Sequence, residues 1–154
     1  MNLPLPQTQP LKTRTDWDGV LGQLQSPFAS VSFKYKGYKI SVVREYQSES
    51  SSKLAVYIDD QIKGAWISLN FGETGDVNKL KEQPAVIDDV WMLKTKARYD
   101  KKFIASVEKI WGKREAKKRY PDLHGKRQFR WPYFNKASSV VRQFKKLEGI
   151  ELCL

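Results

Sequence analysis

The 154-residue chain contains one cysteine, one histidine and no long apolar run. The single Cys153 cannot form an internal disulfide, so nothing indicates a secreted, disulfide-stabilised protein. Together with His124 it also cannot supply the four ligands of a structural zinc site. No segment approaches the roughly 18 apolar residues of a membrane span, and the N-terminus lacks the apolar part of a signal peptide. We therefore expect a soluble, cytoplasmic protein without a membrane partner.

Motifs that would fix a reaction are also missing. The sequence GETG, residues 72–75, lacks the spacing and the lysine of a phosphate-binding loop. The acidic pairs at 59–60 and 88–89 are candidates for holding Mg²⁺ in a small nuclease, but turn geometry explains the first pair and a helix start explains the second without a metal. His124 and Cys153 have no evident partner for general-base or nucleophilic catalysis. The sequence thus indicates no catalytic residue, no metal ligand and no cofactor, and it favours a non-enzymatic protein.

The positive charge is concentrated in one part of the chain. The net charge is +11, yet residues 1–90 carry 10 basic and 11 acidic side chains. Residues 91–154 carry 18 basic and 6 acidic side chains, a balance of +12. A neutral half joined to a basic half predicts a directed electrostatic face, which would attract a polyanionic partner.

The N-terminal segment predicts an arm followed by a short helix. Residues 1–14 are rich in proline and polar side chains, so we expect them to be flexible and to lie outside the domain. A helix should begin at Thr15, with Asp18 completing the cap. Trp17 and Val20 then fall on one face of this helix, which Ser26-Pro27 ends.

Alternating apolar residues predict four strands joined by short turns. These strands are expected at 30–35, 38–43, 53–58 and 62–69, with a two-residue turn at Lys36-Gly37 and a tight turn at Asp59-Asp60-Gln61. They would form an antiparallel meander. Residues 70–83 are expected to be a loop, and residues 84–93 to contain a helical turn.

Two longer helices are expected near the C-terminus. Apolar residues at helical spacing predict one at 98–119, with Phe103, Ile110 and Trp111 in its apolar stripe. Residues 121–132 are expected to form a loop, and a second helix should run from Asn135 to 147, with Gly149 just beyond it. Residues 150–154 are expected to add a short terminal strand. The fold class is therefore α+β: residues 15–154 form one domain, a four-stranded meander packed by the short N-terminal helix and two longer C-terminal helices.

The segment KREAKKRYPDLHGKRQFRWPYF, residues 113–134, is the strongest candidate for a binding surface. It places eight Lys or Arg residues and five aromatic residues in 22 positions. Arrays of Lys and Arg bind phosphate backbones, and aromatic side chains in a basic groove can stack on unpaired bases. The candidate phosphate-binding residues are Lys109, Lys113, Arg114, Lys117, Lys118, Arg119, Lys126, Arg127 and Arg130, and the candidate base-stacking residues are Tyr120, Phe129 and Tyr133.

Other interpretations of this segment remain open at the level of sequence. A lysine-rich helix face can be merely solvated, or it can dock an acidic protein, and aromatic residues before a helix are often part of the core. Trp131 and Phe134 in particular are expected beneath the last helix. The leading hypothesis is a small basic accessory protein that binds DNA or RNA. The alternatives are a protein-interaction module, as found among phage and mobile-element proteins that regulate or inhibit a larger machine, and a small Mg²⁺-dependent nuclease.

Overall fold

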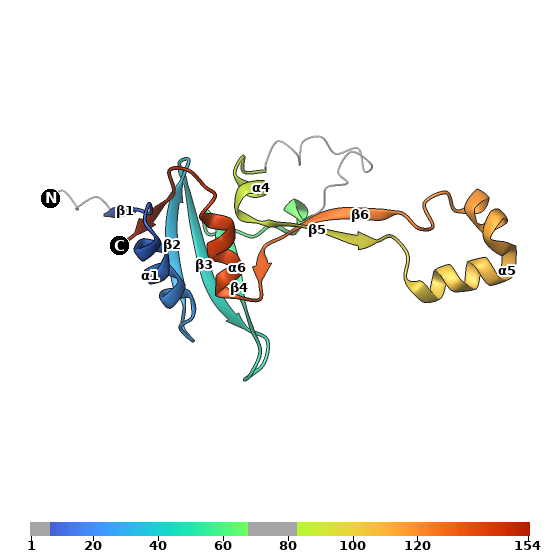
Figure 1. The fold of residues 1–154 in the computed structure, drawn as a ribbon, viewed down its shortest axis with the longest axis horizontal. Coiled ribbons are helices and arrows are strands. Elements are labelled where there is room, and N and C mark those ends of the chain that lie inside the picture. Colours follow the sequence, from blue (N-terminus) through green and yellow to red (C-terminus); the bar gives the residue numbers. More distant parts are fainter. Residues whose placement is uncertain (1–6, 68–82) are drawn as a thin grey trace.

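A six-stranded antiparallel sheet forms the largest layer of the molecule (Figure 1). The structure is a computed structural model, and it describes residues 7–67 and 83–154. The strand order is β1-β8-β2-β3-β4-β7. The strands are β1 (Thr8–Pro10), β2 (Ser30–Tyr35), β3 (Tyr38–Tyr46), β4 (Ser52–Ile58), β7 (Tyr133–Phe134) and β8 (Glu151–Cys153). Two further strands, β5 (Met92–Ala97) and β6 (Lys126–Trp131), pair only with each other.

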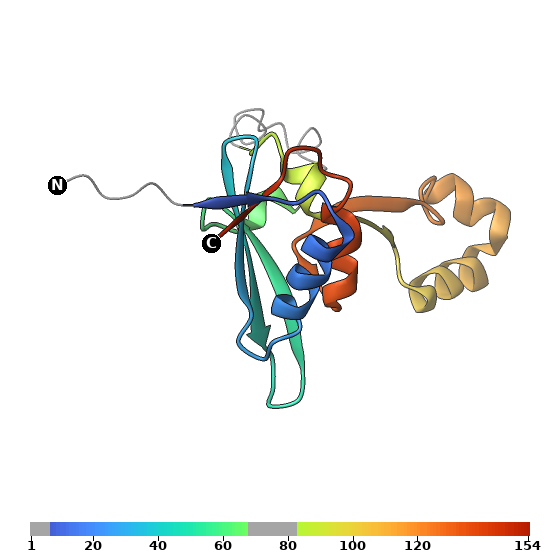
Figure 2. The same cartoon turned by 60° about the vertical axis from the view of Figure 1, so that its left-hand side comes forward.

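Helices α1 (Arg14–Leu24) and α6 (Ala137–Phe144) lie side by side on one face of this sheet (Figure 2). Alternate residues of β2, β3 and β4 point towards the two helices, and these apolar side chains are almost completely buried. Phe144 of α6 meets Phe33 of β2 edge to face, with ring centroids 5.3 Å apart. The helical turns η1 (Gly64–Trp66) and α4 (Ile87–Val90) complete this core, which also buries Trp17 and Trp66, as expected.

The central hairpins confirm the prediction from alternation. Strands β2, β3 and β4 pair in sequence order. Lys36 and Gly37 have φ angles of +49° and +85°, and Asp59 and Asp60 have φ angles of +49° and +63°. Two successive positive φ values define the tight hairpin turn whose twist matches the flanking strands. The helical turn expected within residues 84–93 is α4.

The four-stranded meander is wrong as a description of the whole sheet. The expected fourth strand, 62–69, contains η1 instead, because Gly64 interrupts the alternation, and residues 68 and 69 lie outside the described ranges. Strands β7, β8 and β1 complete the sheet from distant parts of the chain. The loop expected at 70–83 falls almost wholly on residues that the structure does not describe.

The N-terminal helix begins two residues earlier than expected. Thr13, rather than Thr15, is the N-cap: its hydroxyl accepts from the Asp16 amide (3.1 Å), and the Asp16 carboxylate accepts from the Thr13 amide (3.0 Å). This reciprocal pair is a complete capping box. Within the segment 1–14, expected to be a flexible arm, residues 8–10 form β1 and pair with β8, and Leu11 is buried. Residues 1–6 lie outside the described part of the chain.

The C-terminal helices exist, but one of them does not pack as expected. Helix α5 (Lys101–Arg119) lies far from the sheet, at the end of the β5–β6 ribbon (Figure 1). Its predicted apolar stripe is therefore not docked on the sheet: Ile110 is 71 % exposed and Trp111 is 43 % exposed. The expected loop at 121–132 contains β6, and α6 is shorter than the predicted 135–147, with Lys136 rather than Asn135 at its N-cap. Gly149 has the expected positive φ, +83°, and β8 follows it.

Candidate nucleic-acid interface

Nearly all of the net charge belongs to one projecting unit, which we call the basic hairpin, residues 92–131. It consists of β5, α5 and β6 (Figures 1 and 2). These 40 residues carry 14 basic and 4 acidic side chains, a balance of +10, whereas the other 114 residues have a balance of +1. The hairpin therefore concentrates a strong positive field on an element that extends away from an almost neutral body.

Local sequence explains how the hairpin forms. The two strands pair antiparallel from Met92↔Trp131 to Ala97↔Lys126, and we call this part the ribbon. The ribbon ends where the Arg98 amide donates to the Gly125 carbonyl, 2.9 Å away. Beyond it lies the tip, residues 99–124, in which Asp100 caps α5 by accepting from the Phe103 amide (2.6 Å).

The tip has a small apolar cluster of its own. Val107, Ala116 and Leu123 are buried against each other, separately from the main core. Helix α5 can fold back over this cluster because Gly112 interrupts it with a φ of +78°, a conformation that suits glycine. The tip is thus a compact unit held together by its own contacts.

The root of the hairpin is fixed to the body by Arg130. Its guanidinium donates to the Asp88 carboxylate at 2.6 and 3.3 Å and to the Gln83 side chain at 2.8 Å, and its side chain is only 12 % exposed. The Arg130 amide also donates to the Ile67 carbonyl (2.7 Å). Arg130, which the sequence assigns to phosphate binding, thus uses its guanidinium donors and its charge in contacts within the protein.

Further contacts hold the chain just before β5. The side-chain amide of Gln143 donates to the carbonyls of Asp89 and Trp91, at 3.0 and 2.7 Å. The indole N–H of Trp91 donates to the Val56 carbonyl (3.0 Å). The ribbon consequently leaves the body at a well-defined position, which is what a preorganised binding surface requires.

Most of the predicted phosphate-binding residues lie on the hairpin with their side chains in solvent. Arg119 is also exposed, but its guanidinium stacks over Trp111, 3.7 Å from the ring centroid, and lies 3.6 Å from Glu115. The other exposed residues are Lys109, Lys113, Arg114, Lys117 and Lys118 on α5, and Lys126 and Arg127 on β6. The structure divides them into two groups, because those on α5 belong to the tip and those on β6 to the ribbon.

The three candidate stacking residues have different surroundings. Tyr120 packs against Phe103 and Tyr99, with ring centroids 5.5 and 6.1 Å away, so it supports the tip and is not placed to receive a base. Phe129 lies edge to face with Trp131 at 5.9 Å, and Trp131 with Tyr133 at 5.3 Å. These last three aromatic residues follow one another along the root of the ribbon, and all three are only partly buried.

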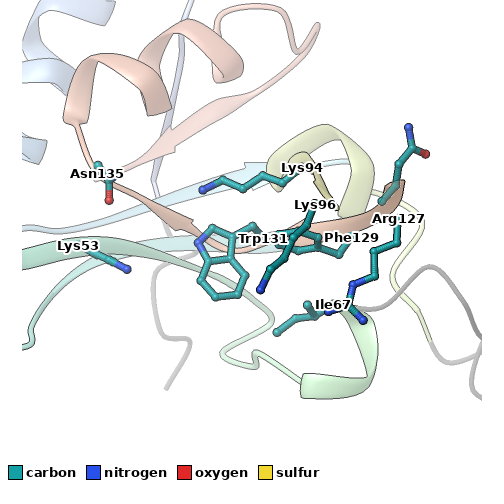
Figure 3. Close-up of a pocket in the computed structure, with 9 residues that line it drawn as sticks. Lys53, Ile67, Lys94, Lys96, Arg127, Phe129, Trp131 and Asn135 are labelled. Carbon is teal, nitrogen blue, oxygen red and sulfur yellow. The ribbon is translucent and has the colours of Figure 1, made fainter. Parts of the chain in front are cut away.

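A hollow of about 500 Å³ opens beside these aromatic side chains (Figure 3). Its lining residues come from β4, from the chain after η1, from both strands of the ribbon and from the link between β7 and α6. They are Lys53, Ile67, Lys94, Lys96, Arg127, Gln128, Phe129, Trp131 and Asn135. Sequence reasoning had assigned Arg127 and Phe129 to a binding surface but missed Lys53, Lys94 and Lys96. The sequence also predicts both Trp131 and Phe134 beneath the last helix. Phe134 is buried, but Trp131 is only partly buried.

A second hollow adjoins the first. It measures about 340 Å³ and is lined by Glu45, Tyr46, Gln47, Lys53, Trp131 and Tyr133. Lys53 and Trp131 line both hollows. The phenol of Tyr57 donates a hydrogen bond to Glu45, and this bond raises the pKa of Tyr57 to about 12 because ionisation would place a second negative charge beside the carboxylate.

The residues considered for catalysis are occupied by structural contacts or stand apart. Asp59 accepts from the Lys39 amide (2.9 Å), and Asp60 pairs with the Lys39 ammonium (3.2 Å). Asp88 binds Arg130, as described above, and no group of three or more metal-ligating side chains occurs within residues 7–67 and 83–154. His124, in the tip, lies 3.1 Å from Glu108, whereas Cys153 lies in β8 at the far side of the molecule (Figure 1).

Comparisons with protein-family models, with curated proteins and with solved structures found no match to this chain. Among the helices in the described ranges, none is both long and apolar enough to cross a bilayer.

Proposed function

We propose that this chain is a non-enzymatic nucleic-acid-binding protein and that the basic hairpin contacts the phosphate backbone. The observation that carries the proposal is the location of the charge: a balance of +10 lies on the 40 residues that project from a body with a balance of +1. Phosphate backbones are bound by such Lys and Arg arrays, because each contact releases a condensed counterion. An extended, charged projection can follow a nucleic acid over several phosphates.

The geometry supports contacts that position the protein rather than contacts that read a sequence. Exposed cations come from both strands of the ribbon and from several sides of α5. They do not form a single row along one helix face, as side chains that contact base edges in a groove would. Contacts to phosphates fix register but carry no direct sequence information. We therefore expect binding to random DNA or RNA, with an affinity that depends strongly on salt.

Charge reversal on the hairpin tests this proposal. The test variant replaces Lys96, Lys117 and Lys126 by Glu, which changes one exposed residue in each of β5, α5 and β6. The control replaces Lys12, Lys145 and Lys146 by Glu, which changes the net charge equally on exposed residues of the body. Binding to a labelled random oligonucleotide would be followed by fluorescence anisotropy at several salt concentrations.

The hairpin variant should bind more weakly, with a shallower dependence of log K on log salt. Each lost phosphate contact reduces that slope by about 0.9 on a duplex and about 0.7 on a single strand, so three contacts give a change of up to about 2.7 or about 2.1. The body variant should keep the slope of the wild-type chain. Equal losses in the two variants would show that only the total charge matters, and the proposal would then fail.

A protein-interaction module is the second candidate function, and a separate observation favours it. Ile110 and Trp111 expose apolar surface at the bend of α5, at the outermost part of the molecule. Exposed apolar groups that gather at one place are typical of protein interfaces. Pull-downs from a source lysate, with and without nuclease treatment, should separate the two functions. A protein that is captured after nuclease treatment and lost with Ile110→Ser would support this second function.

A further inference from the structure

We infer that the hollow at the root of the basic hairpin is a binding site for single-stranded nucleic acid. In this site unpaired bases would stack on Trp131 and Phe129 while phosphates contact the surrounding cations. The inference rests on the proposed function and adds to it the kind of nucleic acid and the place where it is recognised.

The register of the ribbon creates the site. Residues that oppose each other directly in an antiparallel pair point to the same face, and residues two apart along a strand share that face. The pairs Lys94↔Phe129 and Lys96↔Arg127 therefore lie on one face, and Trp131 follows two residues after Phe129. Three cations, Lys94, Lys96 and Arg127, and two aromatic rings, Phe129 and Trp131, thus share one side of the ribbon, and all five residues line the hollow. Figure 3 shows Lys94 and Lys96 reaching alongside the Trp131 ring.

The electrostatics of the hollow favour an anion. Four of its lining residues are cations, namely Lys53, Lys94, Lys96 and Arg127, and none of its lining residues is a carboxylate. None of these four cations takes part in an ion pair within the described ranges. Arg130, on the opposite face of the ribbon, is by contrast neutralised by Asp88. Four uncompensated positive charges around one hollow repel each other, and bound phosphates would relieve that repulsion.

The aromatic residues add a second, independent requirement for the ligand. Phe129 and Trp131 stand nearly perpendicular to each other, at 87°, and are partly exposed to the hollow. The Lys94 ammonium lies 5.7 Å from the centre of the Trp131 ring, a cation–π distance at which the lysine can exchange its ring contact for a phosphate. A ring beside a cation matches a nucleotide, which has an aromatic base beside a charged phosphate.

The same arrangement favours unpaired over paired strands. In a duplex the faces of the bases are covered by their neighbours in the stack, so a ring in a concave site cannot reach them. An unpaired base can turn out of the strand and enter a hollow of about 500 Å³, which lies within the range of about 300–1,000 Å³ typical of ligand sites. The adjoining hollow beside Tyr133 offers space for the next nucleotide, although Glu45 makes it less favourable to a phosphate.

Three probes of equal length test the inference on the wild-type chain: a single-stranded oligo-dT, a phosphodiester strand with abasic sites in place of its bases, and a DNA duplex. Their affinities would be measured by fluorescence anisotropy at several salt concentrations, and the three probes would be compared at the same concentration. Stacking on one aromatic residue should make oligo-dT bind between about fivefold and about 150-fold more tightly than the abasic strand. Equal affinity for these two strands would overturn the inference, and this comparison requires no variant.

Two tryptophan variants locate the contact. Trp131→Leu should reduce the affinity for oligo-dT by a similar factor and leave the affinity for the abasic strand unchanged. Trp111→Leu is the matched control, because it removes a partly exposed tryptophan from the tip, away from the hollow, and it should leave the preference for oligo-dT intact. If Trp131→Leu weakens all three probes equally, or if Trp111→Leu abolishes the preference, the hollow is not the stacking site.

The two proposals fail in different ways. If the wild-type chain binds none of the three probes, the proposed function itself is wrong. If it binds duplex, oligo-dT and abasic strand with equal affinity and a strong dependence on salt, nucleic-acid binding by the hairpin stands and only the stacking site is refuted.

Discussion

Replacing the tip by the dipeptide Asn-Gly should leave the body of the protein folded. The apolar cluster of the tip shares no residue with the main core, so its removal exposes no core side chain. Arg98 and Gly125 already form a hydrogen-bonded pair at the end of the ribbon. A two-residue loop between them fits an antiparallel hairpin, and Asn-Gly has the backbone preference that such a loop needs.

The expected change in stability follows from the length of the loop. Residues 99–124 amount to 26 positions, and each halving of a loop lowers the entropic cost of closing it by about 0.6 kcal/mol. Reducing 26 residues to two should therefore raise the free energy of unfolding by up to about 2 kcal/mol. The excision removes eight basic and four acidic side chains and lowers the net charge from +11 to +7, which also reduces repulsion within the molecule.

Urea denaturation monitored by far-UV circular dichroism measures this prediction. The variant should unfold in one cooperative transition, with a free energy of unfolding at or above that of the wild-type chain. Destabilisation by more than about 1 kcal/mol, or the loss of cooperativity, would refute the description of the tip as a separate unit. Because the variant keeps six basic and no acidic side chain at 92–98 and 125–131, it should also retain its preference for oligo-dT over the abasic strand.

Three further predictions concern local contacts. Thr13→Ala should lower the free energy of unfolding by about 1 kcal/mol, because it removes the N-cap of α1. Thr15→Ala should change the free energy of unfolding by less than about 0.5 kcal/mol. Urea denaturation of both variants decides which threonine caps the helix. The hydrogen bond to Glu45 raises the pKa of Tyr57 to about 12. The contribution of this bond to the free energy of unfolding is therefore complete below pH 10 and is lost as the pH rises towards 12. Tyr57→Phe should therefore unfold with a weaker dependence on pH in this range, as measured by denaturation at successive alkaline pH values; an unchanged pH dependence would contradict the assignment. Leu123→Ala should loosen the tip by about 2 kcal/mol without affecting the core, so hydrogen exchange should accelerate in α5 and stay unchanged in β3.

Local patterns were sufficient for the elements whose partners lie nearby. Strands β2, β3 and β4 could be predicted because their apolar residues alternate and short turns join them, so sequence order and spatial order agree. Helix α5 could also be located from its apolar spacing. Its position could not be predicted, because the same stripe can dock on a sheet or, as here, fold back around Gly112 to form a small cluster of its own.

The candidate site was predicted only in part, for a related reason. Arg127 and Phe129 were recognised because they fall in a segment of high charge and aromatic content. Lys94 and Lys96 were missed, although the two-residue alternation in MLKTKA and KRQFRW was the available signal. The alternation places these lysines beside the aromatic residues only because the two segments, about 30 residues apart, pair in one register, and this pairing cannot be inferred from either segment alone.

The amino-acid sequence by itself determined the amount of positive charge, its confinement to the later part of the chain and the local preference for each strand and helix. These properties depend on residue type and on neighbours a few positions away. Only the tertiary structure decided which cations stay free and which, like Arg130, are neutralised by an acid brought from elsewhere. It also decided that lysines of β4 and β5 meet aromatic rings of β6 around one hollow, because such a meeting depends on long-range strand pairing that no short stretch of sequence records.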